Sequence, residues 1–230
     1  MSPPIESLPS DTQRQLALEV RLRDDATLDN FLASPSVEPL ILALQRQSSP
    51  EGEAIIYLYG PPGTGKSHLL QGCCHARGGD ALYLPLGDLA PHDPEDVLQG
   101  AESLGLVCLD DVDQVLGNER WELALFSLCN RARQSGSRLL VSGSAAPRVL
   151  TVILPDLRSR LSWGIVYQLP EADDEEKAAI LQFRAARRGL SLSAEVASYI
   201  VTRAPRSMEQ LLGVLDLLDK TSLVEQRALS

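Results

Sequence analysis

The sequence predicts an α/β fold in which a five-stranded parallel sheet is flanked by helices and followed by a small all-helical domain. Five short apolar segments alternate with helical patterns over residues 25–170. A glycine-rich segment joins the first strand to a helix, and only helical periodicity follows Pro170. We therefore expect a flexible N-terminal arm at residues 1–24, an α/β domain at 25–170 and a helical lid domain at 171–230.

The glycine-rich segment matches the phosphate-binding pattern G-x-x-x-x-G-K-[ST] at every fixed position. It consists of Gly60, Pro61, Pro62, Gly63, Thr64, Gly65, Lys66 and Ser67. An apolar strand precedes it and a helix begins after it at His68, which we count among the nucleotide-binding residues. Backbone N–H groups would surround the phosphates, Lys66 would reach the outer ones, and the Ser67 hydroxyl would complete a Mg²⁺ shell. The motif and both flanks disfavour the alternative, a structural glycine-rich turn.

Two carboxylates end another predicted strand. The apolar residues Leu106–Leu109 run directly into Asp110 and Asp111. A buried parallel strand presents such groups at the carboxyl edge of the sheet, where ligands bind in folds of this kind. Asp110 would hold Mg²⁺, directly or through water, and Asp111 would orient or activate the attacking water. A strand that simply ends in a polar turn is the alternative. The next strand, at 138–144, also ends in small polar groups, which predicts Ser142 beside the γ-phosphate.

Turn and capping signals set the other elements of the α/β domain. Asp93 followed by Pro94 is typical of a helix start, and we expect Gly105 to end that helix. Pro85 indicates that the second strand lies near an edge of the sheet. The other expected elements are an amphipathic helix at 37–47, strands at 54–59, 81–86 and 165–169, a helix from Trp121 to about Gly136, and a helical or turn-rich segment at 147–161.

Three helices are predicted in the lid domain. Asp173 and Glu176 form a capping-box pattern, Ser193 caps the second helix, and the third follows Pro205. An apolar stripe predicts the core face of the third helix, made of Met208, Leu211, Leu212, Leu215 and Leu218. Arg206, at the start of this helix, is locally unfavourable by roughly a few tenths of a kcal/mol. It is either a solvated arginine or a group that faces a bound phosphate.

Composition and charge narrow the classes of function. Hydrophobic residues make up 44% of the chain and charged residues 23%, an ordinary soluble composition. The net charge of −10 argues against strong, sequence-independent DNA binding, which usually needs a basic surface. The four cysteines lie in apolar segments without a C-x-x-C pair, so we expect reduced core residues. No apolar run is as long as a membrane span and the N-terminus has no signal-peptide pattern, which favours a cytoplasmic protein.

An isolated apolar patch lies in the N-terminal arm, at Gln15-Leu16-Ala17-Leu18. Polar residues and prolines surround it. The patch is either an edge strand of the α/β domain or a short peptide motif that docks in the groove of a partner protein.

These elements in this order resemble an AAA+ ATPase. The closer resemblance is to the DnaA family, and within it to the Hda proteins, the regulatory inactivators of DnaA. It spans roughly residues 13–230, and Ser159-Arg160-Leu161-Ser162-Trp163-Gly164 is its most discriminating stretch. The other stretches that carry it are residues 28–32, the phosphate loop, residues 109–112 and residues 206–211.

The resemblance implies roles for further residues. Asn30 and Phe31 would lie on the adenine side of a bound ADP or ATP, and Arg206 would be the sensor 2 arginine. Arg160 would lie on the surface that faces a neighbouring AAA+ subunit and would stabilise transition-state charge on the partner's ATP, as an arginine finger does. The alternative for Arg160 is a surface salt bridge.

The implied function is regulation of replication initiation. The protein would dock on the DNA polymerase sliding clamp (β subunit) through Gln15, Leu16 and Leu18, and stimulate hydrolysis of DnaA-bound ATP so that initiation is not repeated. Its own hydrolysis would be weak, because Asp111 is shorter than the glutamate of many AAA+ proteins. The resemblance implies no strong direct DNA binding and no membrane, and it allows self-association and a chain that continues beyond Ser230.

Two other classes of protein remain as alternatives. One is a helicase loader or DnaA-type initiator paralogue that acts on single-stranded DNA, which the acidic charge disfavours. The other is a P-loop phosphotransferase that acts on a small molecule, which the arginine-bearing segment and the helical lid disfavour.

Overall fold

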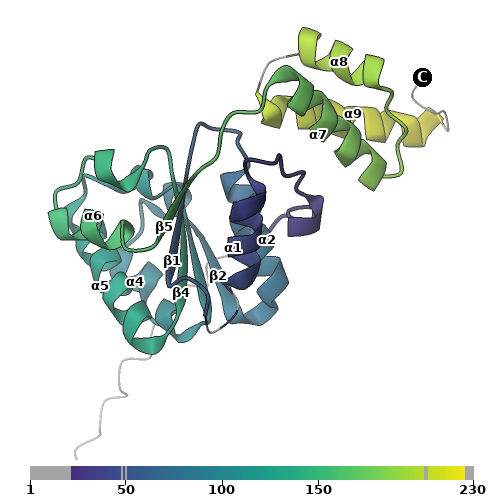
Figure 1. Ribbon diagram of the computed structural model, residues 1–230. Coiled ribbons are helices and arrows are strands. Elements are labelled where there is room, and N and C mark those ends of the chain that lie inside the picture. The colour runs from purple at the N-terminus through teal and green to yellow at the C-terminus, as the bar shows by residue number, and fades with distance from the viewer. Residues whose placement is uncertain (1–21, 48, 50, 205–206, 226–230) are drawn as a thin grey trace, which may run out of the picture.

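The computed structural model describes residues 22–47, 49, 51–204 and 207–225, which form an α/β domain and a helical domain (Figure 1). The strands are β1 (Ile55–Tyr59), β2 (Ala81–Pro85), β3 (Leu106–Asp110), β4 (Arg138–Gly143) and β5 (Ile165–Gln168). The helices of the first domain are α1 (Glu38–Arg46), α2 (Lys66–Arg77), α3 (Leu86–Leu89), α4 (Pro94–Leu98), α5 (Glu119–Ser135) and α6 (Pro155–Leu161). Those of the second are α7 (Asp174–Arg187), α8 (Ala194–Arg203) and α9 (Met208–Glu225).

The five strands form one parallel sheet in the order β2-β3-β4-β1-β5. The predicted fold class is therefore confirmed, and β2, with Pro85 at its end, is an edge strand as expected. Because β1 lies next to β4 and β4 next to β3, the phosphate loop after β1 and the acids at the end of β3 share the carboxyl edge of the sheet.

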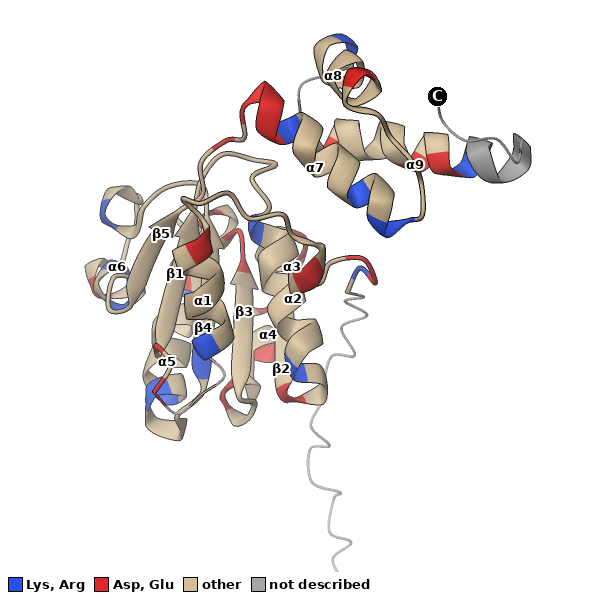
Figure 2. Ribbon diagram, turned by 45° about the vertical axis from the view of Figure 1, so that its right-hand side comes forward, with Lys and Arg blue, Asp and Glu red and all other residues tan. Residues whose placement is uncertain are grey.

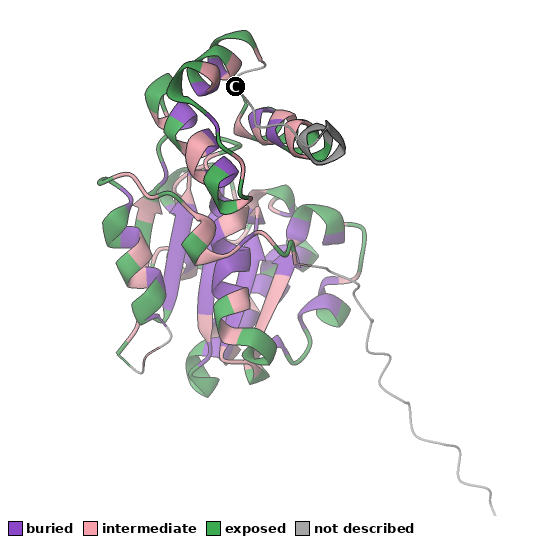
Figure 3. Ribbon diagram, turned by 90° about the vertical axis from the view of Figure 1, so that its right-hand side faces the viewer, coloured by how far each residue is buried: buried purple, intermediate pink, exposed green. Residues whose placement is uncertain are grey.

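Alternating strand residues build a separate core on each face of the sheet. On β1, Ile55 and Tyr57 pack on the face covered by α3, α4, α5 and α6, and Ile56 and Leu58 pack on the face covered by α1 and α2. Figure 3 shows the strands as the most continuously buried part of the domain. The cysteines (Cys73, Cys74, Cys108 and Cys129) are free and buried in these two cores, as predicted.

One helix differs from its prediction. The segment from Pro94 to Gly105 was expected to be a single helix, but α4 ends at Leu98. Gly100 has a φ of 73°, in the left-handed region, and a 3₁₀ turn follows at Ala101–Ser103. Glycine adopts this conformation at little cost, so the helix ends before Gly100 and not at Gly105.

The helical domain has a core of its own. The capping box of Asp173 and Glu176 is formed at the start of α7, and Ser193 accepts a hydrogen bond from the Val196 N–H at the start of α8. Leu211 and Leu215 of α9 are buried against α7 and α8, as the apolar stripe predicts. The three helices lie beyond the carboxyl ends of the strands, where they can cover the phosphate loop (Figure 1).

A buried carboxylate fastens the loop that precedes α6. The Glu122 side chain on α5 is fully buried and accepts three backbone N–H groups. One oxygen accepts from Gly117 at 2.8 Å and Ile153 at 3.0 Å, and the other accepts from Leu154 at 2.6 Å. This side chain therefore holds two loops against α5 and fixes the direction in which the chain enters α6.

Replacing Glu122 by alanine should lower the free energy of unfolding by about 3 kcal/mol, because three buried N–H groups would lose a charged acceptor. Urea denaturation followed by circular dichroism measures this loss. Glu119→Ala is the matched control, since Glu119 is exposed on the same helix and its removal should cost less than about 0.5 kcal/mol. Equal losses for the two variants would contradict the fastening role.

Candidate functional site

The phosphate loop is shaped by glycines at positions that no other residue fits. A Cβ atom at Gly60 would collide with the carbonyl oxygen of Leu169, and Gly63 and Gly65 have φ values of 80° and 94°. The Thr64 hydroxyl closes the turn by donating to the Pro61 carbonyl at 3.0 Å. Helix α2 begins immediately afterwards, so its free N–H groups and the positive end of its dipole face the loop.

Lys66 brings a buried positive charge to this loop. Its residue exposure is 7%, and its ammonium group donates to the carbonyls of Gly60 at 2.9 Å and Pro61 at 3.1 Å. Backbone carbonyls balance a full charge only in part, so the loop retains a positive potential. The loop is therefore suited to bind an anion such as a phosphate chain.

The acids at the end of β3 are held by side chains from the neighbouring strands. Asp110 is 3% exposed and accepts hydrogen bonds from the Tyr83 hydroxyl at 2.6 Å and from the Ser142 hydroxyl. The Ser142 oxygen also accepts the Asp111 N–H at 2.8 Å. Ser142 is fully buried, so the structure brings it to the two acids and sets it behind them, as a support for their positions.

Asp111 has the backbone and the environment of a functional residue. Its φ is 53°, the one positive value for a non-glycine residue in the described part of the chain. Burial, and then the charges of Asp110 and Asp113, raise the pKa of Asp111, while the nearby Lys66 lowers it. A carboxylate with a raised pKa is the better proton acceptor and can orient water next to a phosphate.

The donor set fits a magnesium ion carried by a nucleotide. Among the described residues, no group of three or more His, Cys, Asp or Glu side chains could hold a metal ion. Mg²⁺ commonly binds through one or two protein oxygens together with phosphate oxygens and water. The Ser67 hydroxyl at the start of α2 and Asp110 at the end of β3 are oxygens of that kind.

The segment predicted on the adenine side packs against the start of α2. The Phe31 ring lies so close to Gly65 that a Cβ there would be 2.7 Å from the ring, and its centroid is 5.8 Å from that of His68. The His68 Nε2 hydrogen-bonds the Thr27 carbonyl at 2.9 Å, and burial lowers the pKa of His68. Phe31 and His68 are thus brought together beside the phosphate loop.

Asn30 joins this segment to the lid. Its side-chain amide donates to the Asp25 carbonyl at 2.8 Å, and its own carbonyl accepts from Arg184 of α7 at 3.0 Å. The Arg184 side chain is 4% exposed and also forms an ion pair with the Asp25 carboxylate. Arg184 of the lid therefore contacts the segment predicted on the adenine side at two residues, Asp25 and Asn30.

The start of α9 lies against the phosphate loop. A Cβ atom at Gly63 would be 3.7 Å from the Met208 N and 3.8 Å from the Met208 Cβ. Arg206, the predicted sensor 2 arginine, lies outside the described residues, two positions before Met208. Its role stays a prediction.

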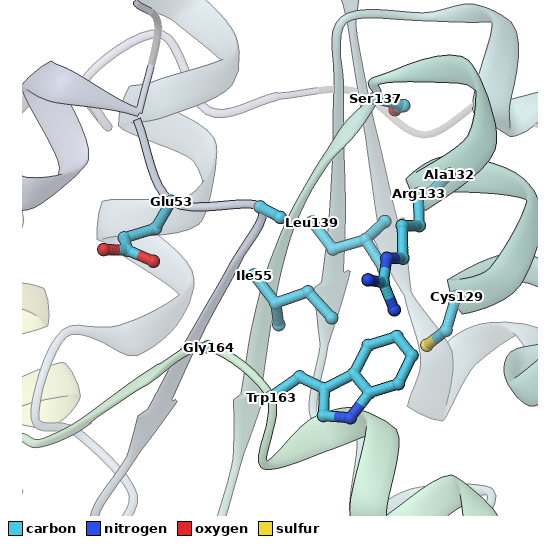
Figure 4. Close-up of a pocket in the computed structure, with 10 residues that line it drawn as sticks. Glu53, Ile55, Cys129, Ala132, Arg133, Ser137, Leu139, Trp163 and Gly164 are labelled. Carbon is cyan, nitrogen blue, oxygen red and sulfur yellow. The ribbon is translucent and has the colours of Figure 1, made fainter. Parts of the chain in front are cut away.

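Arg160 lies against two aromatic rings. Its guanidinium carbon lies 3.7 Å from the centroid of the Trp163 ring and 5.2 Å from that of Phe126 (a residue of α5). Arg133, also on α5, covers Trp163 at 4.5 Å (Figure 4). Within the described chain, the Arg160 guanidinium forms no ion pair, and its buried Nε has no hydrogen-bond partner. The alternative of a surface salt bridge is therefore not seen.

The turn that follows Arg160 lies at the amino end of the sheet, away from the phosphate loop. Gly164, four residues after Arg160, packs so closely on the Ile55 carbonyl that a Cβ atom would overlap it. Ile55 begins β1, whereas the phosphate loop begins at Gly60, after β1 has ended. A cavity of about 370 Å³ also lies at this amino end, between Glu53, Arg133 and Trp163 (Figure 4). This cavity is therefore separate from the predicted nucleotide site.

Comparison with known proteins matches both domains. Residues 56–167 match the family of ATPases associated with various cellular activities (AAA), and residues 174–230 match the Hda lid domain. A Haemophilus influenzae protein described as uncharacterized is 42% identical over 221 residues, which cover 94% of this chain and 95% of that one. The chain belongs to the DnaA/Hda family of AAA+ ATPases.

Solved structures agree with this family at the level of the fold. Domain III of Thermotoga maritima DnaA has a TM-score of 0.75 with 23% identity, and the match covers 91% of this chain and 94% of that one. AMPPCP-bound Aquifex aeolicus DnaA has a TM-score of 0.72 with 24% identity over 86% of this chain. The match covers 66% of that DnaA chain, so the present chain spans about two thirds of the length of the Aquifex aeolicus protein.

These findings indicate an AAA+ nucleotide-binding protein related to replication initiation proteins. In the part of the chain that the structure describes, no helix is long and apolar enough to cross a membrane. Gln15, Leu16 and Leu18 lie outside that part, so the clamp-binding motif stays a prediction.

Sequence reasoning missed three residues that organise the site. Arg184 binds Asp25 across 159 positions of the chain, and no local pattern marks such a contact. No local pattern marks Phe126 of α5 as a contact of Arg160. Trp163 lies in the stretch 159–164 that carries the family resemblance, but its stacking with Arg133 depends on how α5 packs against that stretch.

Proposed function

We propose that this protein is an AAA+ regulator that docks on the sliding clamp and stimulates hydrolysis of DnaA-bound ATP. The observation that carries the proposal is the Arg160 guanidinium, which has no ion pair among the described residues and stacks on Trp163, in the turn that packs at the amino end of β1. A cation in that position is available to a nucleotide held by another subunit.

The geometry of the sheet supports action on a partner's nucleotide. Strand β1 has five residues, which span about 17 Å at roughly 3.3 Å per residue, and it separates the level of Gly164 from the phosphate loop. An arginine side chain does not bridge that length. Because Arg160 stacks on Trp163 in this turn, the geometry favours a role on a nucleotide held by another subunit over one on the nucleotide that its own Lys66 would bind.

The protein's own nucleotide would be an adenine nucleotide with Mg²⁺. Lys66 and the N–H groups of α2 would bind its phosphates, Asp110 and Ser67 would hold the ion, and Phe31 would border the base. When bound, the ion neutralises charge on the phosphates. Asp111 would orient water, but its short side chain suits weak hydrolysis, so nucleotide binding here mainly sets the state of the protein.

The decisive experiment measures hydrolysis of radiolabelled ATP bound to DnaA, with this protein and DNA-loaded clamp present. Acceleration that needs both the clamp and this protein supports the proposal. Single-stranded DNA is present in one related DnaA structure, so the same preparation is tested for binding to it. Tight DNA binding without acceleration of hydrolysis would instead identify an initiator paralogue. The distribution of charge disfavours that outcome, because basic residues are scattered over the described chain and acidic residues gather at the start of α7 (Figure 2).

Replacing Gln15, Leu16 and Leu18 together by alanine should remove clamp binding, because an amide and two leucines are the anchors that a peptide groove holds. Surface plasmon resonance on immobilised clamp measures the effect, and nucleotide affinity should stay within twofold, roughly the scatter of such assays. Replacement of Glu6 by alanine in the same arm is the control. If the triple variant unfolds, the segment is part of the core and not a docking motif.

A further inference from the structure

We propose that Phe126 and Trp163 are positioning residues that hold the Arg160 guanidinium with its edge free for a phosphate of a partner subunit. The inference rests on the proposed function, because it assigns the residues that prepare Arg160 for that task. It concerns a stack of four side chains in the order Arg133, Trp163, Arg160 and Phe126, which we call the arginine–aromatic ladder.

The ladder is built from two helical segments. Phe126 and Arg133 are seven positions apart on α5, so they lie on one face of that helix two turns apart. Arg160 lies in the last turn of α6 and Trp163 follows in the turn before β5, with the Trp163 N–H bonded to the Arg160 carbonyl at 3.1 Å. The four groups interleave because each segment supplies one ring and one guanidinium. This arrangement ties the end of α6 to α5 through side chains.

Stacking fixes the plane of a guanidinium and leaves its donors free. Both rings lie close to the Arg160 guanidinium carbon, at 3.7 Å for Trp163 and 5.2 Å for Phe126. A guanidinium donates in its own plane, and a phosphate is recognised by two such parallel donations. Rings packed against the guanidinium therefore restrict its rotation while the terminal N–H groups stay available, which lowers the ordering cost of meeting a phosphate.

The surroundings do not neutralise this cation. In the described residues no carboxylate pairs with Arg160, and its Nε is buried without a hydrogen-bond partner. Cys129 lies between Phe126 and Arg133 on α5, but burial raises the pKa of its thiol to about 12, so it is uncharged at neutral pH. Some arginines elsewhere in the described chain are paired, as Arg131 is with Glu102 and Arg188 with Asp216. Arg160 is thus held by π-systems alone, which is the state expected of a group that awaits an external anion.

The test compares ring variants in the DnaA-ATP hydrolysis assay with DNA-loaded clamp. Trp163→Leu should lower the maximal stimulated rate about tenfold and leave the half-saturating concentration unchanged, because the ring orients Arg160 and does not itself bind the partner. Trp163→Phe should restore most of the rate, and Phe126→Leu should lower it about threefold. Tyr199→Leu is the matched control: it removes a ring that stacks on Arg203 at 5.9 Å in the lid, and the rate should not change.

A second measurement tests the ladder without any activity. In a ¹H–¹⁵N spectrum, the Arg160 Nε–H should lie upfield of the other arginines because two rings shield it, and it should exchange slowly because the Nε is buried. Its assignment follows from its absence in Arg160→Lys. In Trp163→Leu the signal should move to the position of exposed arginines.

The outcomes separate the two proposals. If the wild-type protein does not stimulate hydrolysis, the proposed function fails, and the positioning role fails with it even where the shielded signal is seen. If the wild-type protein stimulates but Trp163→Leu retains the full rate, or if Arg160 gives an unshielded signal, the positioning role alone is overturned. A Trp163→Leu variant that raises the half-saturating concentration at an unchanged maximal rate would also overturn it, since Trp163 would then be a docking residue.

Discussion

Replacing Lys66 by alanine should weaken nucleotide binding by at least about 100-fold, which corresponds to roughly 3 kcal/mol. The ammonium group is buried in the phosphate loop and bonded to the Gly60 and Pro61 carbonyls, so its removal leaves those carbonyls facing the phosphates with no charge between them. Isothermal titration with ADP and with ATP, each in the presence of Mg²⁺, measures the loss.

Lys177→Ala provides the control for that experiment. Lys177 is also a buried lysine, at 6% exposure, but it lies in α7 and pairs with Glu171 at 3.2 Å. Its removal should affect the stability of the lid and leave nucleotide affinity within a few-fold, on the order of 1 kcal/mol or less. If Lys66→Ala binds nucleotide as the wild-type protein does, this loop is not the phosphate site.

Replacing Arg160 by alanine should reduce the stimulation of DnaA-bound ATP hydrolysis by about 10³-fold, the lower end of the range for arginine fingers. Nucleotide and clamp binding should be retained, because Arg160 lies in α6 and not in the phosphate loop or the N-terminal motif. Arg160→Lys should rescue poorly, since an ammonium group lacks the planar pair of donors and stacks less well on Trp163. Single-turnover hydrolysis under saturating concentrations of this protein gives the rate directly.

Arg158→Ala is the matched control for Arg160→Ala. Arg158 lies two positions earlier on α6, so it points to another side of the helix, and none of the described rings stacks on it. The Arg158→Ala change should lower the stimulated rate of hydrolysis less than tenfold, which corresponds to roughly 1.4 kcal/mol. Full stimulation by the Arg160→Ala protein would rule out the finger assignment, and a larger effect at Arg158 would transfer the role to that residue.

The parts of the fold that local sequence determines were predictable. The phosphate loop combines a fixed motif with a strand before it and a helix after it, and all three are encoded within residues 54–77. The helices of the lid begin where Asp173 and Ser193 cap them, because caps satisfy the first N–H groups of a helix locally. The prediction for residues 94–105 was wrong because an apolar, acidic segment looked continuous, whereas Gly100 adopts a left-handed conformation there.

The contacts that assemble the site were not predictable in the same way. Ser142 was expected to face the γ-phosphate from its place at the end of β4, yet the register sets its hydroxyl between the Asp110 carboxylate and the Asp111 N–H. The stacking of Arg160 and the grip of Arg184 on Asp25 depend on how separate elements pack. A one-dimensional pattern identifies which residues are chemically able to act, and the three-dimensional packing decides which of them meet.

The contacts of Arg184 predict that lid opening and nucleotide release are coupled. The lid holds Asp25 and Asn30, and the same segment carries Phe31 against the phosphate loop, so movement of the lid would also move the segment predicted on the adenine side. Burial favours a higher pKa for Asp25, but Arg23 and Arg184 outweigh it and hold that pKa below its ordinary value. The stabilisation is therefore complete above the ordinary carboxyl range and is lost only as the pH falls through the lowered pKa. At neutral pH we therefore expect the lid and this segment to move together, so that the rate of lid opening would limit the release of a bound nucleotide.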